Sequence, residues 1–238
     1  MTKENVYAAI LAGGSGTRMG NANKPKQFFL LNETPIIIHT IEKFCTSGLF
    51  EKVLVLCPEA WLQQTSDLIK KHCPENLDAV DLVAGGAERS DTVMNAVSHI
   101  EQTYGVDENT VIVTHDAVRP FVSYRILEEN IAAAKEFGAC DTVIPASDTI
   151  VESVDGNLIS DIPPRGNFYQ GQTPQSFQLL KLKDLQSSLS VEEKAALTDA
   201  CKVFILRGEK VALVEGDVSN MKITYPQDML VAEALVGE

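Results

Sequence analysis

The fold is decided by residues 6–20, which read Val-Tyr-Ala-Ala-Ile-Leu-Ala-Gly-Gly-Ser-Gly-Thr-Arg-Met-Gly. The apolar part, Val6–Leu11, has the length of a buried strand. The glycine-rich part lets backbone N–H groups approach an anion closely, because glycine has no side chain in the way. We therefore predict a strand that ends in an anion-binding loop, with a plain glycine-rich turn as the alternative.

The loop differs from two familiar nucleotide-binding motifs. No Gly-Lys-Ser/Thr follows it, as a Walker A loop requires, and its glycines miss the dinucleotide pattern G-x-G-x-x-G by one residue. This spacing counts against a Rossmann-type oxidoreductase, the rival enzyme class. Arg18, Lys24 and Lys26 lie in or just after the loop, where cations can neutralise charge that develops on a triphosphate.

Strand-like and helix-like segments alternate along the chain. Short apolar runs at 52–57, 81–84, 111–114 and 142–145 indicate further buried strands. Amphipathic helices are predicted between them, with the apolar faces Ile37, Ile41 and Phe44; Val93, Ala96, Val97 and Ile100; and Leu127, Ile131 and Ala134. Such alternation predicts an α/β fold with a doubly wound, mostly parallel, Rossmann-like sheet, which binds ligands at the carboxyl ends of its strands. No linker or repeat divides the sequence, so residues 1–238 are predicted to form one domain.

Residues 148–164 depart from this alternation. They contain Asp155-Gly156, a pair that suits a tight hairpin turn. We predict that this segment forms a β-hairpin arm that projects from the main sheet.

Two later loops at predicted strand ends carry charged residues. Gly85-Gly-Ala-Glu-Arg-Ser-Asp-Thr92 leads into a helix, whose N-terminus can receive an anion. Ser90 and Asp91 could instead act only as helix caps. In His115-Asp-Ala-Val-Arg-Pro120, Asp116 could meet a hydroxyl or magnesium and Arg119 a phosphate, unless the two form an ion pair that braces the turn; His115 is expected to be a packed histidine.

Three further segments place cations or hydroxyls in turn-rich contexts. They are Pro163–Gly166 with Arg165, Gly171–Phe177 with Thr173, and Asn220–Asp228 with Lys222. Taken alone, Lys222 would be interpreted as a solvated surface lysine.

Composition restricts the partners and the compartment. A formal net charge of −13 opposes binding to nucleic acid and to anionic membranes. The apolar stretch at 6–12 is too short for a signal peptide or a membrane span. Five scattered cysteines without a C-x-x-C pair are typical of reduced thiols, so we expect a cytoplasmic protein.

Six segments in order resemble the family of cytidylyltransferases that act on ribitol 5-phosphate or 2-C-methyl-D-erythritol 4-phosphate. These are Leu11–Met19, Pro25–Gln27, Gly85–Arg89, His115–Pro120, Gln172–Phe177 and Asn220–Thr224. The resemblance spans nearly the whole chain. It implies a nucleotidyltransferase fold similar to glycosyltransferase A, and transfer of a cytidylyl group from CTP to a polyol phosphate with release of pyrophosphate.

The resemblance also implies roles for individual residues. Arg18 and Lys26 would stabilise the transition state, and Arg165 and Lys222 would position the attacking phosphate. The implied CTP site comprises Leu11, Ala12, Gly13, Gly14, Gly16, Gly86, Ala87, Glu88, Arg89, Ser90, Asp91, Thr92 and Asp116. The implied acceptor site comprises Asp116, Arg119, Thr149, Arg165 and Thr173. Magnesium is expected with CTP, with Asp116 as its candidate ligand, through water. The family pattern further implies a homodimer in which the arm at 148–164 reaches the partner.

Two segments bear on the acceptor. Val118 replaces the second alanine of the His-Asp-Ala-Ala-Arg-Pro pattern typical of the erythritol-phosphate enzymes, and Ala200 and Lys202 replace an acidic residue and a serine. Both differences look like the ribitol-phosphate branch, so ribitol 5-phosphate is the predicted acceptor and 2-C-methyl-D-erythritol 4-phosphate the alternative. A CTP-binding module without turnover is the non-enzymatic alternative; the presence of Arg165 and Lys222 counts against it.

Overall fold

The computed structural model describes residues 5–14, 24–197 and 199–236. Within them, a seven-stranded sheet has the strand order β5-β4-β1-β6-β8-β7-β9. The strands are β1 (Val6–Leu11), β4 (Lys52–Cys57), β5 (Val80–Ala84), β6 (Val111–Asp116), β7 (Ala139–Pro145), β8 (Tyr169–Gln178) and β9 (Ala212–Glu215). A short separate pair joins β2 (Leu30–Leu31) to β3 (Thr34–Pro35). Every pairing in the large sheet is parallel except those of β8 with β6 and β7, so the predicted mostly parallel sheet is confirmed.

The strand β8 corrects the interpretation of Gly171–Phe177 as a turn-rich loop. These residues form most of a ten-residue strand that is buried from Gln172 onward. Their polar side chains resemble a turn in sequence, but inside the sheet they find partners. For example, Gln175 Nε2 donates to Asp141 Oδ1 at 3.0 Å, and the Ser176 hydroxyl donates to Asn130 Oδ1 at 3.2 Å.

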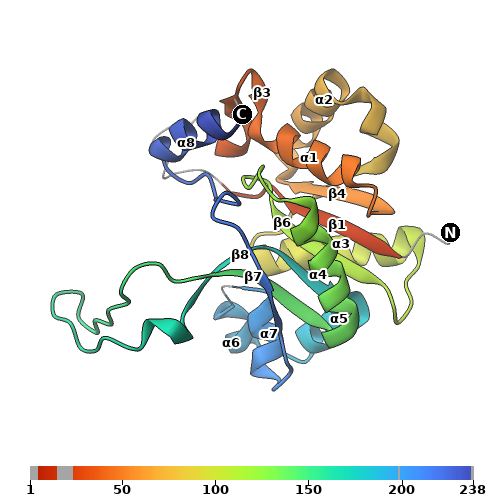
Figure 1. The fold of residues 1–238 in the computed structure, drawn as a ribbon. Coiled ribbons are helices and arrows are strands. Elements are labelled where there is room, and N and C mark those ends of the chain that lie inside the picture. The colour runs from red at the N-terminus through yellow and green to blue at the C-terminus, as the bar shows by residue number, and fades with distance from the viewer. Residues whose placement is uncertain (1–4, 15–23, 198, 237–238) are drawn as a thin grey trace.

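Helices cover both faces of the sheet (Figure 1). The predicted apolar faces lie in α1 (Ile36–Ser47), α3 (Arg89–Tyr104) and α4 (Tyr124–Phe137), and all of their named residues are buried. Further helices are α2 (Leu62–His72), α5 (Leu179–Ser187), α6 (Val191–Ala195), α7 (Cys201–Leu206) and α8 (Pro226–Val236). Among the described residues, no helix is long and apolar enough to cross a membrane.

The core has two layers because side chains alternate along each strand. In β1, Val6, Ala8 and Ile10 pack with α1, α2 and α4, whereas Tyr7, Ala9 and Leu11 pack with α3, α5 and α7. The chain leaves β1 through α1 to β4 on one side, and β6 lies on the other side. The winding therefore reverses between β1 and β6, where a doubly wound sheet opens a crevice for ligands.

The arm projects from the body, but it is not a regular hairpin (Figure 1). It contains one isolated bridge, between Glu152 and Asp161, in place of the predicted ladder. A turn is present where it was predicted: Gly156 has a φ of 74°, and the Asp155 carboxylate accepts from the backbone of Asn157 at 2.8 Å. A pair of strands without a packed face is marginal in water, which explains why the ladder is not sustained.

Candidate active site

A cavity of about 330 Å³ opens at the carboxyl ends of β1 and β6. Its lining comes from the glycine-rich loop, the start of α3, the end of β6 and the segment before α8. The lining residues are Leu11, Ala12, Gly13, Gly14, Lys26, Gln27, Gly86, Ala87, Glu88, Arg89, Thr92, Asp116, Ala117, Val118, Lys222 and Thr224. The structure thus brings together segments that lie more than 200 residues apart in sequence.

The glycine-rich loop begins where β1 ends. The Ala12 N–H donates to the Leu56 carbonyl at 2.7 Å, and Gly13 and Gly14 are exposed at the cavity. A Cβ on either glycine would meet no atom of the described residues within 4 Å, so those residues leave the backbone here accessible to a ligand. The predicted site residues Gly16 and Arg18 lie outside the described residues.

Lys26 and Gln27 follow in a single 3-10 turn (Lys26–Phe28). Lys26 is 7% exposed and lines the cavity, although lysine is usually a surface residue. Gln27 Nε2 donates to the Ala12 carbonyl at 2.6 Å, which ties this turn to the start of the glycine-rich loop. The sequence prediction did not include Gln27 as a site residue, although its position beside Lys26 in Pro-Lys-Gln could have indicated it.

The start of α3 forms the second wall. Glu88 and Asp91 form a capping box, so Asp91 acts as a helix cap and does not line the cavity; Ser90 does not line it either. The Gly86 N–H donates to the Thr92 hydroxyl at 3.0 Å. A Cβ on Gly86 would clash with the Asp91 side chain and lie 2.8 Å from the Asp91 carbonyl carbon, so a glycine is required at this close approach.

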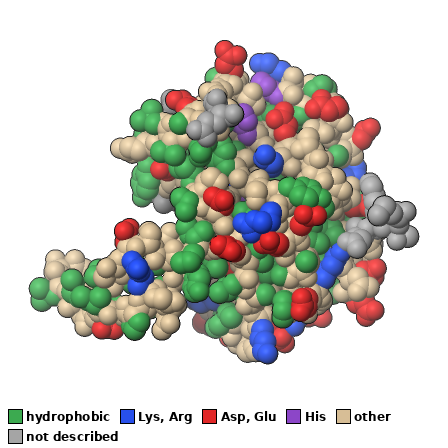
Figure 2. All heavy atoms as spheres, in the orientation of Figure 1, with side chains coloured by type: hydrophobic (Ala, Val, Ile, Leu, Met, Phe, Trp, Pro, Cys, Tyr) green, Lys and Arg blue, Asp and Glu red, His purple; other side chains and the backbone are tan. Residues whose placement is uncertain are grey.

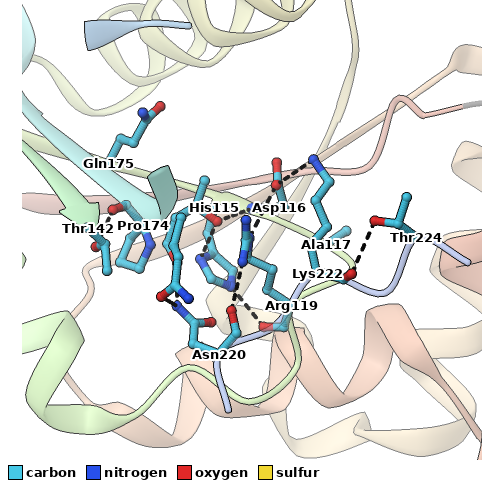
Figure 3. Close-up of polar contacts among 12 residues, drawn as sticks. His115, Asp116, Ala117, Arg119, Thr142, Pro174, Gln175, Asn220, Lys222 and Thr224 are labelled. Carbon is cyan, nitrogen blue, oxygen red and sulfur yellow. Dashed lines mark hydrogen bonds and ion pairs between the residues drawn. The ribbon is translucent and has the colours of Figure 1, made fainter. Parts of the chain in front are cut away.

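Asp116 gathers three cations at the end of β6. Arg89 Nη1 lies 2.6 Å from Asp116 Oδ1, and Lys222 Nζ and Arg119 Nε lie 2.9 Å and 3.5 Å from Asp116 Oδ2. Figure 3 shows Lys222 and Arg119 directed toward this carboxylate from separate segments. The cations come from α3, from the turn after β6 and from the segment before α8, so Asp116 ties three walls of the cavity together.

These cations set the ionisation of Asp116. Burial would raise the pKa of its carboxyl, but the charges of Arg89, Lys222 and Arg119 hold that pKa well below its usual range. Asp116 is therefore ionised at neutral pH and cannot serve as a proton acceptor there. The ion pair of Asp116 and Arg119, which was the alternative interpretation of this turn, is present as part of a larger cluster, and Lys222 is paired with Asp116 rather than being a solvated surface lysine.

Arg119 and Thr173 lie behind this cluster. Arg119 is 8% exposed, and its Nη1 donates to the Asn220 carbonyl at 2.7 Å. The Asn220 side chain is buried between the Thr173 carbonyl at 2.8 Å and Gln172 Oε1 at 3.1 Å. Neither Arg119 nor Thr173 lines the cavity, so their direct contact with an acceptor stays a prediction.

Arg165 and Thr149 are not brought to the cavity. Thr149 is exposed on the arm and Arg165 is exposed directly after it, where Arg165 Nη1 donates to the Ser147 carbonyl at 2.8 Å. The same arm exposes large apolar side chains: Val154 is 87% exposed and Leu158 is 73% exposed. Figure 2 shows hydrophobic side chains over this projecting segment.

The described residues offer two places to test for a metal. At Asp116, both carboxylate oxygens face cations, so direct ligation of Mg²⁺ does not fit this arrangement. Asp141, Asp199 and Cys201 place ligand atoms within 4.8 Å of one another, but Gln175 Nε2 donates to Asp141 at 3.0 Å and to Asp199 at 2.7 Å. An amide N–H group between two carboxylates satisfies them without an ion.

Comparison with known proteins identifies close relatives. Residues 6–238 match the family model described as IspD, 2-C-methyl-D-erythritol 4-phosphate cytidylyltransferase. The chain is 51% identical over 231 residues to a protein of Lactiplantibacillus plantarum named ribitol-5-phosphate cytidylyltransferase, which covers 97% of this chain and 98% of that protein.

Solved structures agree with this result. A 2-C-methyl-D-erythritol 4-phosphate cytidylyltransferase from Thermus thermophilus is similar with a TM-score of 0.74 and 26% identity over the whole of both chains. The enzyme of the same name from Francisella tularensis has a TM-score of 0.79 and 26% identity, covering 97% of this chain and 99% of that one. The similarity therefore extends over the body and the arm alike.

Proposed function

The chain belongs to the 2-C-methyl-D-erythritol 4-phosphate cytidylyltransferase (IspD) family, and we propose that it transfers the cytidylyl group of CTP to D-ribitol 5-phosphate. A phosphate oxygen of the acceptor attacks the α-phosphorus of CTP. The bond from the α-phosphorus to the bridging oxygen breaks, and pyrophosphate leaves with that oxygen. The products are CDP-ribitol and pyrophosphate.

The charge arrangement of the cavity supports this chemistry. The acceptor carries its own nucleophile, an ionised phosphate, so no residue must remove a proton. Asp116 is held ionised among cations. Burial lowers the pKa of His115 to about 4, so the ring is neutral at pH 7. Rate enhancement then depends on positioning and on cations that meet negative charge in the transition state.

Roles follow from place and charge. Arg18 and Lys26 would meet charge that develops on the phosphates, and Lys222 would hold the acceptor phosphate together with Arg165. CTP would bind across Leu11–Gly14, Gly16 and Gly86–Thr92. In this proposal, Ser90 and Asp91 stabilise the start of α3, which forms one wall of the cavity, and do not contact CTP directly.

Magnesium would enter with CTP. Mg²⁺ dehydrates reluctantly and often binds substrate phosphates and water rather than a protein cage. Because the oxygens of Asp116 already face cations, triphosphate oxygens and water are the expected ligands, and contact with Asp116 would run through water.

We propose a homodimer in which the arm of one chain completes the acceptor site of the other. Arg165 and Thr149 are exposed and away from the cavity of their own chain, and the arm around them exposes Val154 and Leu158. Exposed apolar patches of this kind mark interaction surfaces.

The cytoplasm is the proposed location. All five cysteines are unpaired, and Cys57, Cys73, Cys140 and Cys201 are buried. Unpaired thiols are typical of proteins in a reducing compartment.

The identity of 51% with a protein named ribitol-5-phosphate cytidylyltransferase carries the choice of acceptor. Val118 supports it, because this position lines the cavity. The second candidate acceptor is 2-C-methyl-D-erythritol 4-phosphate, because the matching family model bears its name.

The test is pyrophosphate release from CTP and Mg²⁺, measured in parallel with the two acceptors. We expect a large preference in kcat/KM for ribitol 5-phosphate. Preference for the branched erythritol phosphate would support cytidylyl transfer but would contradict ribitol 5-phosphate as the acceptor. Nucleotide binding without release on either acceptor would point to a binding module instead.

A further inference from the structure

His115 lies directly before Asp116 in β6, yet it does not line the cavity. Its side chain is fully buried, and its ring centroid lies 5.0 Å from that of Phe44. A histidine that served only to fill space in the core would need no hydrogen-bond partners in the site. Both ring nitrogens, however, make hydrogen bonds with groups of the site.

The direction of these hydrogen bonds is fixed by the chemistry of the partners. His115 Nε2 lies 2.9 Å from the Arg119 carbonyl oxygen, which can only accept, so Nε2 carries the proton. In the neutral ring Nδ1 is then an acceptor, and the Thr173 hydroxyl at 3.1 Å must donate to it. The same Thr173 oxygen accepts from the Asp116 N–H at 3.1 Å.

The resulting chain of hydrogen bonds spans the turn after β6. It runs from the Asp116 N–H through Thr173 and His115 to the Arg119 carbonyl, so it holds both ends of the segment 116–119. Between these ends, Ala117 and Val118 line the cavity. Any shift of this turn would move the Asp116 carboxylate and with it Arg89, Arg119 and Lys222.

We propose that His115 is a positioning residue for cytidylyl transfer: oriented by Thr173, its ring holds the turn 116–119 so that Asp116 keeps three cations in place around the cavity. This role rests on the proposed function. It also fixes the direction of hydrogen bonding at Thr173. The proton of the Thr173 hydroxyl is donated to His115, so the hydroxyl oxygen can only accept a hydrogen bond from a substrate. Thr173 would therefore favour a polyol hydroxyl over a phosphate oxygen.

Matched substitutions separate the two hydrogen bonds of the ring. His115→Gln retains an N–H donor near the Nε2 position and loses the acceptor for Thr173, whereas His115→Asn retains an acceptor near Nδ1 and loses the donor. Both lose the ring contact with Phe44. We expect each to lower kcat/KM for ribitol 5-phosphate about tenfold, more than it changes KM for CTP, because a buried partner is left unsatisfied.

Thr173 provides a second route if the His115 variants unfold. Thr173→Val should cause a similar loss, and Thr173→Ser should restore activity because it returns the hydroxyl. In a His115→Gln background, Thr173→Val should add little, because the acceptor that Thr173 serves is already gone. If the two losses multiply instead, Thr173 acts independently of His115 and the proposal is wrong.

A spectroscopic readout tests the chain without activity. In ¹⁵N NMR spectra at pH 7, His115 of the wild type should show a protonated Nε2 and an unprotonated Nδ1, and the Nδ1 signal should shift in Thr173→Val. The reverse tautomer would overturn the proposal.

His39→Gln is the matched control. His39 Nε2 also lies hydrogen-bonded to a backbone carbonyl, that of Leu31 at 2.8 Å, outside the candidate site. It should leave kcat/KM unchanged; an equal loss there would mean that any such change disturbs the fold. A wild type that transfers to neither acceptor would overturn the proposed function, whereas normal wild-type turnover with unaffected His115 variants would overturn only this role.

Discussion

The cavity and the arm differ in almost every physical respect. Lys26, Asp116 and Arg119 in or behind the cavity are each less than 9% exposed, and Asp116 binds cations from three segments. On the arm, Leu158 is 73% exposed, and one bridge between Glu152 and Asp161 replaces a ladder. One region is held in place by its own chain, whereas the other exposes groups that the described part of its own chain leaves uncovered.

The difference indicates how the proposed site is divided. The nucleotide half is preorganised, because buried hydrogen bonds and ion pairs fix its geometry before a ligand arrives. In the proposed function, the acceptor half depends on Thr149, which lies on the arm, and on Arg165, which directly follows it; both are exposed. We infer that a single folded chain binds CTP well but transfers poorly until a second chain supplies its arm.

The largest effect should come from removing the buried cation of the cavity. Lys26→Met keeps much of the side-chain volume and removes the charge, so we expect kcat to fall by about 10²–10³, as for the loss of one transition-state donor. Steady-state pyrophosphate release measures it. Lys70→Met in the last turn of α2 is the control and should retain activity. Wild-type turnover by a folded Lys26→Met variant would remove Lys26 from the mechanism.

A smaller effect should come from the wall formed by α3. Gly86→Ala would force a Cβ against Asp91 and to 2.9 Å from the Thr92 nitrogen. We expect KM for CTP to rise about tenfold and the unfolding free energy to fall by about 1–3 kcal/mol, the usual cost of overpacking.

The neighbouring glycine is the matched control for this substitution. Gly85→Ala places its Cβ no closer than 3.5 Å to another group, an ordinary contact, and should change KM for CTP little. Calorimetry and initial rates on both variants test the contrast. Equal behaviour of the two variants would mean that the position of α3 does not control nucleotide binding.

The sequence predicted most of the sheet and its helices better than it predicted the strand β8. Apolar periodicity identified β1, β4 and the helices that cover them, because burial on one face leaves a clear repeat. It failed for β8, whose Gly, Gln, Thr and Ser residues resemble a loop and gain their partners only from strands distant in sequence. The cavity-lining glycines were recognisable from the sequence, whereas Gln27 was missed: Pro-Lys-Gln could have indicated its position, but its hydrogen bond to the Ala12 carbonyl is formed only in the fold.

Mixing two inactive variants should test the division of the site directly. Lys26→Met damages the nucleotide half and Arg165→Ala the arm. In a homodimer with shared sites, an equal mixture that exchanges subunits forms heterodimers with one intact site, so about a quarter of wild-type activity should return. Each variant alone gives the baseline, and native mass spectrometry of the mixture, with one variant isotopically labelled, shows whether the subunits have exchanged. No recovery despite exchange would place Arg165 in the site of its own chain.

The smallest effect on activity is expected at Asp141, where a substitution should change stability instead and show whether preorganisation comes from cations rather than from burial alone. Asp141 in β7 accepts a hydrogen bond from Gln175, but it lies beside Asp199 rather than among cations. Burial, opposed by the Gln175 hydrogen bond and reinforced by the charge of Asp199, raises the pKa of Asp141 to about 6. Asp116 is buried at the end of β6, which pairs with the other edge of β8. The cations around Asp116 shift its pKa in the opposite direction, below its usual range.

The sign of the resulting pH dependence follows from proton binding. The unfolded carboxyl has a pKa of about 3.9, so between about pH 4 and pH 6 the folded state binds more protons and its stability falls as pH rises. Asp141→Asn cannot ionise, and its Oδ1 can still accept from Gln175. It should therefore be more stable than the wild type by about 2–3 kcal/mol above pH 6, because each pKa unit corresponds to about 1.4 kcal/mol, with the gain vanishing near pH 4. Urea unfolding across this range measures the difference.

Asp67→Asn is the control, because Asp67 also accepts from a glutamine, Gln63 at 3.0 Å, but on the exposed face of α2. A gain that persisted at pH 4 would mean that Asn packs better than Asp, and that the missing cation is not what distinguishes Asp141 from Asp116.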